Sequence, residues 1–204
     1  SLEPLLDMAA TLKATQLNII AQVMPRSPEA AVPIVERWLD LAKQYPFPVL
    51  METHRNSTLN DLFYTLDVLE KVPQLRLCAD LSHFVVDREL SLPLSDIDHQ
   101  YFNDIIHRSD SFQGRISSNQ QVQIAIEFEQ HAPWVTQYLT WWEDGFRAWS
   151  ERSEANDTLR FLVELGPPPY AITNEHQREL SDRWAEGLLI REWVQSLWLK
   201  ATSS

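Results

Sequence analysis

Glycine is scarce in this sequence. Its 204 residues include four glycines and twelve prolines, whereas average usage would give roughly 14 glycines. The turns must therefore be built with Pro, Asn, Asp and Ser. No glycine-rich loop follows any of the apolar runs, and this excludes the phosphate cradle of dinucleotide-binding proteins.

Three other features are also missing. Cys78 is the single cysteine, so no intramolecular disulfide can form, and a reducing compartment, the cytoplasm, is expected. No apolar run reaches the ~18 residues of a membrane span. Lys/Arg runs are absent, and the net charge of −12 opposes a polyanionic partner. The composition predicts an enzyme of small molecules, with neither nucleic acid nor membrane as a partner.

Helical and strand-like patterns alternate along the chain. Apolar residues recur with helical spacing in six segments, which are 2–12, 28–42, 59–69, 97–107, 133–149 and 174–197. Short apolar runs predict strands in the five segments between them, at 17–23, 47–52, 75–80, 111–116 and 159–164. Such alternation is typical of βαβ units and a parallel sheet covered by helices. It fits an open doubly wound sheet or a (β/α)8 barrel.

Capping residues predict where some of these helices begin. Ser27 and Pro28 form an N-cap and a first-turn proline, although Pro33 favours a later start. Ser57 or Thr58 is the expected cap of the third helix. Asn174 is expected to start the closing helix.

Polar side chains stand at the ends of four predicted strands, at Glu52, Asp80, Gln113 and Glu164. In a parallel α/β protein these ends lie on one face, where active sites are assembled. Three converging carboxylates repel one another unless a cation compensates them, and oxygen-rich ligation favours Mn²⁺ or Mg²⁺ over Zn²⁺. The alternative is that each acid is a solvated strand end or a helix N-cap.

Three segments carry a resemblance to a known family: ETHR at 52–55, LRLCADLSHF at 75–84 and ELGPPPY at 164–170. Together they resemble the xylose isomerase-like TIM-barrel superfamily of sugar isomerases and epimerases, over residues 16–172. The resemblance implies one domain over 1–204, the C-terminal portion of a (β/α)8 barrel with about five of eight β/α units. About three strands are then unaccounted for. The unpaired edges make self-association into a homo-oligomer an expectation.

The resemblance also implies a metal site. A Glu, an Asp, a His and a second Glu hold the metal in that superfamily, which assigns Glu52, Asp80 and Glu164 as ligands here. Gln113 occupies the place of the histidine, and its neutral amide oxygen is a weaker donor than imidazole. His107 is not assigned, because its spacing puts it on the last turn of a helix, where it favours the helix dipole.

A reaction and its catalytic residues follow from the same resemblance. Glu52 and Glu164 would act as base and acid on opposite sides of the carbon chain of a carbohydrate, with a metal-stabilised enediolate. The expected activity is isomerisation or epimerisation of a small sugar, sugar phosphate or sugar acid. His83 would contact a substrate oxygen near the metal, or else it is a capping or hydrogen-bonded histidine.

Three further residues are candidates for substrate binding. His54, Arg55 and Arg115 could hold a substrate carboxylate or phosphate, since arginine suits bidentate recognition. The alternative is that they form ion pairs with neighbouring acids.

Two other functions remain open. Gln113 and the missing strands favour a non-catalytic relative with a decayed site. A metal-dependent endonuclease acting on abasic DNA shares the superfamily, but the net charge of −12 and the lack of histidines for a trinuclear zinc site count against it.

Overall fold

A parallel three-stranded sheet organises the first part of the chain. The computed structural model describes residues 1–203, and the chain divides into two compact units with the boundary after Cys78. The first unit contains α1 (Glu3–Thr11), β1 (Leu17–Ile19), α2 (Pro28–Ala42), β2 (Val49–Glu52), α3 (Leu62–Lys71) and the start of β3 (Leu77–Ala79). β1 pairs with β2, and β2 pairs with β3, both in parallel.

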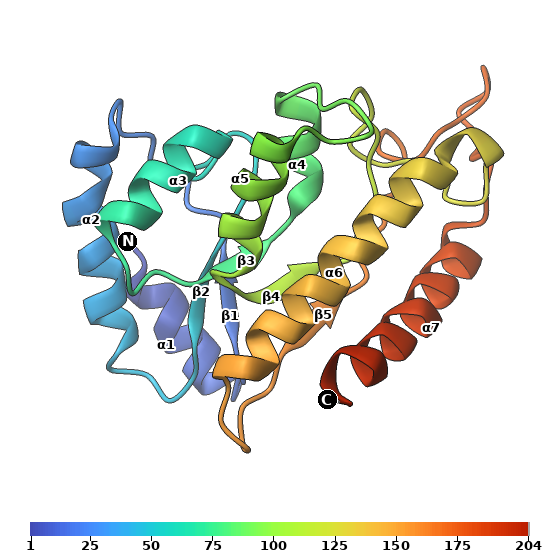
Figure 1. Ribbon diagram of the computed structural model, residues 1–204. Helices are drawn as coiled ribbons and strands as arrows, with labels where there is room; N and C mark the ends of the chain where they lie inside the picture. Colours follow the sequence, from blue (N-terminus) through green and yellow to red (C-terminus); the bar gives the residue numbers. More distant parts are fainter. Residues whose placement is uncertain (204) are drawn as a thin grey trace. The chain divides into compact units, whose positions relative to one another are not determined.

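Apolar side chains fix this first sheet between helices. Leu6 and Ala9 of α1 bury against Phe47, which lies just before β2. The next two helices of this unit pack together, with α2 lying along α3 (Figure 1). The parallel register sets Glu52 beside Cys78, and the Thr53 N–H donates to the Cys78 carbonyl at 3.1 Å. Glu52 therefore stands at the carboxyl end of a fixed strand.

The second unit, from Ala79 onward, is a parallel strand pair covered by long helices. Its elements are α4 (Leu81–Asp87), α5 (Asp96–Ile106), β4 (Ser109–Gln113), a 3₁₀ turn (Glu129–His131), α6 (Ala132–Arg152), β5 (Arg160–Leu162) and α7 (Arg183–Thr202). β4 and β5 are in register from Ser111 opposite Arg160 to Gln113 opposite Leu162. α6 lies along α7 and also contacts β4 (Figure 1).

Aromatic rings fill the core of this second unit. Phe102 stacks on Trp141 with ring centroids 4.6 Å apart, and Trp142 meets Phe161 of β5 edge to face at 4.9 Å. Gly145 lets α6 come this close to the strands, because a Cβ there would lie 2.4 Å from the Phe112 ring. The tryptophans that α6 buries, Trp141, Trp142 and Trp149, are therefore core residues.

The structure corrects several predicted boundaries. The helix α2 begins at Pro28 with Ser27 as its cap, as predicted, and Pro33 does not delay its start but lies inside it; the other boundaries differ from the predictions. The cap of α3 is Asp61, whose side chain accepts from the Tyr64 N–H at 2.7 Å, so Ser57 and Thr58 were the wrong candidates. α7 begins at Arg183 with Asp182 as its cap, well after Asn174. β4 ends at Gln113, earlier than the predicted 111–116.

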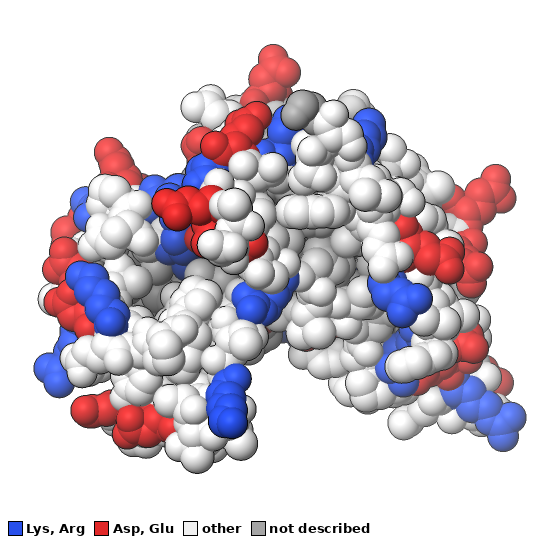
Figure 2. Space-filling view, turned by 90° about the horizontal axis from the view of Figure 1, so that it is seen from below, with Lys and Arg blue, Asp and Glu red and all other residues white. Residues whose placement is uncertain are grey.

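The surface carries mixed charge and some exposed apolar side chains. Lys/Arg and Asp/Glu side chains are scattered among uncharged residues on the face shown in Figure 2. In the second unit Leu162 is 57% exposed and Trp184 is 79% exposed, which keeps self-association an expectation. No helix of the described chain is long and apolar enough to cross a membrane.

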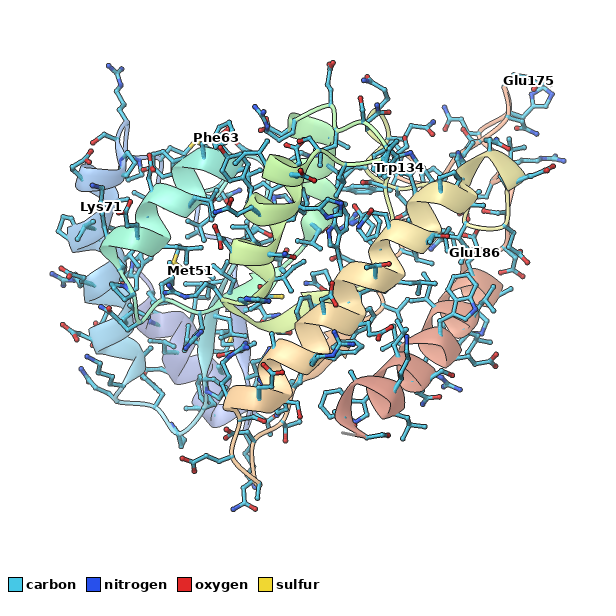
Figure 3. All side chains as sticks on the ribbon, viewed as in Figure 1. Met51, Phe63, Lys71, Trp134, Glu175 and Glu186 are labelled. Atoms are coloured by element: carbon cyan, nitrogen blue, oxygen red, sulfur yellow. The ribbon has the colours of Figure 1, made fainter. Side chains whose placement is uncertain are left out.

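Glu186, on the first turn of α7 (Figure 3), is a buried acid in the second unit. Its Oε1 accepts from the Ile126 N–H at 2.9 Å, which ties α7 to the loop after β4. Burial raises the pKa of Glu186, although the bond from Ile126 opposes this shift. The folded state therefore holds the Glu186 proton more tightly than the unfolded state does, and stability falls as pH rises through the raised pKa.

Replacing Glu186 with Gln should remove this pH dependence. Glutamine keeps an oxygen for the Ile126 N–H but carries no charge at any pH. The free energy of unfolding of Glu186→Gln, relative to the parent, should increase as pH rises from about 4 to 8. Urea titrations at several pH values measure this difference, with the exposed Glu192→Gln on the same helix as control. A difference independent of pH would show that the Glu186 charge is not buried at a cost.

Candidate functional site

Asp80 is fully buried at the start of α4, and its two carboxylate oxygens contact different groups. Oδ1 accepts from the Ser82 N–H at 3.0 Å and from the Ser82 hydroxyl at 2.5 Å, which caps the helix. Oδ2 lies 3.3 Å from Arg115 Nε and 3.4 Å from His83 Nε2. Asp80 is thus a helix cap, as the alternative prediction held, and its second oxygen is directed into a cluster of charged side chains.

Arg115 bridges two acids within the second unit. Its guanidinium contacts Asp80 through Nε and donates from a terminal nitrogen to Glu164 Oε1. The side chain is only 2% exposed, and the Tyr170 ring lies over its Cζ at 5.0 Å. The sequence pointed to substrate binding or an ion pair for Arg115, and the structure contains the ion pair.

The charges explain this arrangement. A carboxylate oxygen of Asp80 lies within 4.8 Å of one of Glu164, which corresponds to roughly 3–4 kcal/mol of repulsion at an effective dielectric constant of about 20. Burial disfavours the Arg115 charge, but Asp80 and Glu164 outweigh it and raise the pKa of Arg115 above its ordinary value. Arg115 is therefore a permanent cation that compensates the two carboxylates.

Glu164 is placed by an extension of the β4–β5 ladder. The Gly114 N–H donates to the Leu162 carbonyl at 2.6 Å, and the Glu164 N–H donates to the Gly114 carbonyl at 3.3 Å. Arg115 takes Oε1, whereas Oε2 is buried and has no hydrogen-bond partner among residues 1–203. Glu164 therefore presents one unsatisfied acceptor oxygen, which a cation or a substrate hydroxyl would satisfy.

Two other predicted residues lie in the same unit. His83 is 2% exposed and sits beside Asp80 on α4, and Gln113 is the last residue of β4 and 6% exposed. Gln113 and Arg115 are two residues apart on a chain that continues the ladder, so both face the same side of it. His107 is the exposed C-cap of α5, in agreement with its predicted place at the end of a helix.

The remaining predicted residues belong to the first unit. Glu52 ends β2 and is 6% exposed. His54 is partly buried with Nδ1 2.5 Å from the Arg55 carbonyl oxygen, and Arg55 is exposed. The roles of these three residues stay predictions.

Sequence reasoning missed Gln123, a buried amide that fixes the loop after β5. Gln123 Nε2 donates to the Gly166 carbonyl at 2.9 Å, and the Gly166 N–H donates to Gln123 Oε1 at 2.7 Å. A Cβ on Gly166 would lie 2.8 Å from the Tyr170 ring, so the loop is closed tightly beside Arg115. The resemblance to the family segment reaches Gln123, but a glutamine within a polar loop is by itself typical of a solvated residue, and no role was assigned to it.

The donor set fits a hard divalent cation. Asp80 Oδ2 and Glu164 Oε2 are carboxylate oxygens within the cluster, the second without a hydrogen-bond partner in the described chain. The amide of Gln113, at the end of β4, would supply a further oxygen donor if the predicted ligand set holds. Oxygen donors of this kind suit Mg²⁺ or Mn²⁺.

Comparisons with solved structures identify the fold of this chain. Neither a protein-family model nor a curated protein matches the sequence. Among solved structures, the chain is similar to AsbF from Bacillus anthracis, a probable 3-DHS dehydratase involved in petrobactin synthesis. The TM-score is 0.52 at 16% identity, over 96% of this chain and 67% of AsbF. This chain has the fold of a xylose isomerase-like TIM barrel.

The predicted fold, an incomplete α/β barrel of this type, is therefore confirmed, with five parallel strands among residues 1–203. A second similar structure is the IOLI protein with a bound zinc atom, with a TM-score of 0.48 at 10% identity over 98% of this chain and 67% of IOLI. That the whole of 1–204 forms one domain stays a prediction.

Removing the Gln123 amide should loosen the loop that carries Glu164. In Gln123→Leu both bonds to Gly166 are lost, and we expect a stability loss of about 1–3 kcal/mol. Hydrogen exchange of the peptide over 164–170 should accelerate, because the Gly166 N–H no longer has an acceptor. The matched control is Gln121→Leu, since Gln121 is exposed in the same loop. Unchanged exchange in Gln123→Leu would mean that the loop is held by other contacts.

Proposed function

We propose that this protein is a divalent-metal-dependent isomerase or epimerase of a small sugar, sugar phosphate or sugar acid. The observation that carries the proposal is Glu164, whose Oε1 is held by buried Arg115 while its buried Oε2 has no hydrogen-bond partner among residues 1–203. A carboxylate oriented through one oxygen and unsatisfied at the other is suited to accept a proton.

Glu164 is the proposed base, and Arg115 is its positioning residue. The contact with Arg115 stabilises the charged carboxylate and fixes its direction. The base would remove a proton from the carbon next to a substrate carbonyl. Glu52, at the end of β2, is the proposed second acid/base, an assignment that rests on the resemblance of its ETHR segment.

His83 and the metal would bind the oxygen atoms of the substrate. His83, beside Asp80, is proposed to contact a substrate oxygen. The proposed metal ligands are Glu52, Asp80, Gln113 and Glu164, with Mn²⁺ or Mg²⁺ favoured over Zn²⁺. When bound, a divalent cation at such a site polarises a carbonyl and stabilises the negative charge that develops on its oxygen.

The proposed partner, location, substrate-binding residues and oligomeric state rest on the sequence analysis. A carbohydrate is the proposed partner in the cytoplasm, without nucleic acid or membrane. His54 and Arg55 are proposed to bind a carboxylate or phosphate of the substrate. The exposed apolar side chains of β5 and α7 make a homo-oligomer part of the proposal.

Proton removal can be tested without knowing the substrate. The Mg²⁺-loaded protein is incubated in D₂O with a panel of C4–C6 sugars, sugar acids and sugar phosphates, and deuterium uptake is measured by mass spectrometry. We expect uptake at a carbon next to the carbonyl of at least one compound. Glu164→Gln, which keeps the oxygen for Arg115 but cannot accept a proton, should lower the rate by about 10²-fold or more.

The outcomes separate the alternatives. Uptake together with loss of water would assign a dehydratase, the activity named for AsbF. No uptake with any compound would contradict the proposal and favour the non-catalytic alternative. Equal rates in the parent and Glu164→Gln would remove Glu164 as the base.

Replacing Gln113 with His should tighten Mn²⁺ or Zn²⁺ binding. Imidazole is a stronger donor than a carboxamide oxygen, and one better ligand should gain ~1–2 kcal/mol, about tenfold in affinity. A competitive chelator titration compares the parent with Gln113→His. Gln121→His, which adds the same ring at an exposed position, controls for binding to any added histidine. Equal or weaker binding by Gln113→His would show that residue 113 does not face the metal.

A further inference from the structure

The cluster in the second unit already contains a cation where the proposed metal would bind. Asp80 Oδ1 is committed to the cap of α4 through Ser82, so Oδ2 is the oxygen that Asp80 directs toward its charged neighbours. That oxygen lies 3.3 Å from Arg115 Nε. A metal ligated by Asp80 Oδ2 would therefore lie against the guanidinium.

Glu164 adds to this conflict through its charge, because its Oε2 is open to a cation while Arg115 holds its Oε1. Arg115 donates to Oε1 of Glu164, and a metal bound by the two acids would compete for the same negative charge. Arg115 is 2% exposed, so water screens the repulsion between the two cations weakly. The Tyr170 ring over Arg115, with 5.0 Å between Cζ and the ring centroid, adds an attraction that holds the guanidinium in place.

We propose that Arg115 is a built-in competitor of the divalent metal, because its guanidinium occupies the Asp80–Glu164 pair and must shift before a metal binds both acids. This inference rests on the proposed metal site. Arg115 would make metal binding weaker than it would be at the two acids without an arginine. While no metal is bound, Arg115 compensates the negative charge of Asp80 and Glu164. Once the metal has taken the two carboxylates, the shifted guanidinium is available for an anionic group, which favours a sugar acid or sugar phosphate over a neutral sugar.

The test is the Mn²⁺ affinity of Arg115→Met, measured by chelator competition. Methionine keeps an unbranched apolar stem and removes the cation, so affinity should rise about tenfold or more relative to the parent. The control is Arg152→Met, which removes one positive charge in the same unit, where Arg152 pairs with Asp110 at 2.7 Å. The control should leave the affinity nearly unchanged.

A second measurement covers the case in which Arg115→Met does not fold. In the ¹⁵N-labelled parent, the buried Nε–H of Arg115 should give a slowly exchanging NMR signal. Mg²⁺ should shift that signal and speed its exchange, because the contact with Asp80 is broken. A signal unchanged at saturating Mg²⁺ would overturn the inference.

The affinities distinguish this inference from the proposed function. Binding by the parent that Asp80→Asn abolishes, with equal or weaker binding by Arg115→Met, would overturn the competition and leave the metal site standing. Binding only by Arg115→Met would support the competition in its strongest form. No binding by either protein would overturn both proposals.

Discussion

The candidate site depends on one constraint, which is that the fully buried carboxylate of Asp80 is held close to the partly buried carboxylate of Glu164. Asp80 is fully buried and Glu164 has a buried, unsatisfied oxygen. Charges in such surroundings must be compensated or neutralised. Arg115 provides the compensation by contacting both acids. The loop after β5 in turn closes against Arg115 through Tyr170 and is fixed by the amide of Gln123.

The aromatic core holds the parts of this cluster in register. The β4–β5 ladder and its extension carry Gln113, Arg115 and Glu164, and α6 covers the ladder with packed rings. The fit is tight enough that Gly145 could not bear a side chain without moving Phe112. Since packed interiors transmit small displacements, the geometry of the acids depends on this packing as well as on their own contacts.

A metal and an arginine are two solutions to the same electrostatic problem. The resemblance to metal-dependent isomerases points to the first, and the contacts of Arg115 in the second unit provide the other. If Gln113 stands in the place of a histidine, as the resemblance implies, its neutral amide would lower the attraction for a metal further. A site balanced between the two states could bind metal and an anionic substrate together, because each would relieve the cost of the other.

The sequence by itself determined the alternation of helices and strands and the residues at the strand ends. Glu52 ends β2 and Asp80 follows β3 directly, as predicted, and the polar residue Gln113 does end β4 although the strand was drawn as far as 116. These features are local, since they arise from hydrophobic periodicity within a few residues. The caps of α3 and α7 were missed, because several Ser, Asp and Asn residues near each start have similar local preferences.

Only the tertiary structure decided which charged groups meet. Arg115 and Glu164 are 49 residues apart in the chain, and Gln123 and Gly166 are 43 apart. No periodicity links such positions, because their contact is set by strand register and by how the loops close over the strand ends. Hydrophobic periodicity therefore located the acids along the chain, but the tertiary structure decided that Arg115 is their partner. Two adjacent carboxylates that are shielded from water must be compensated by a cation or neutralised by a proton, and here the fold supplies the cation.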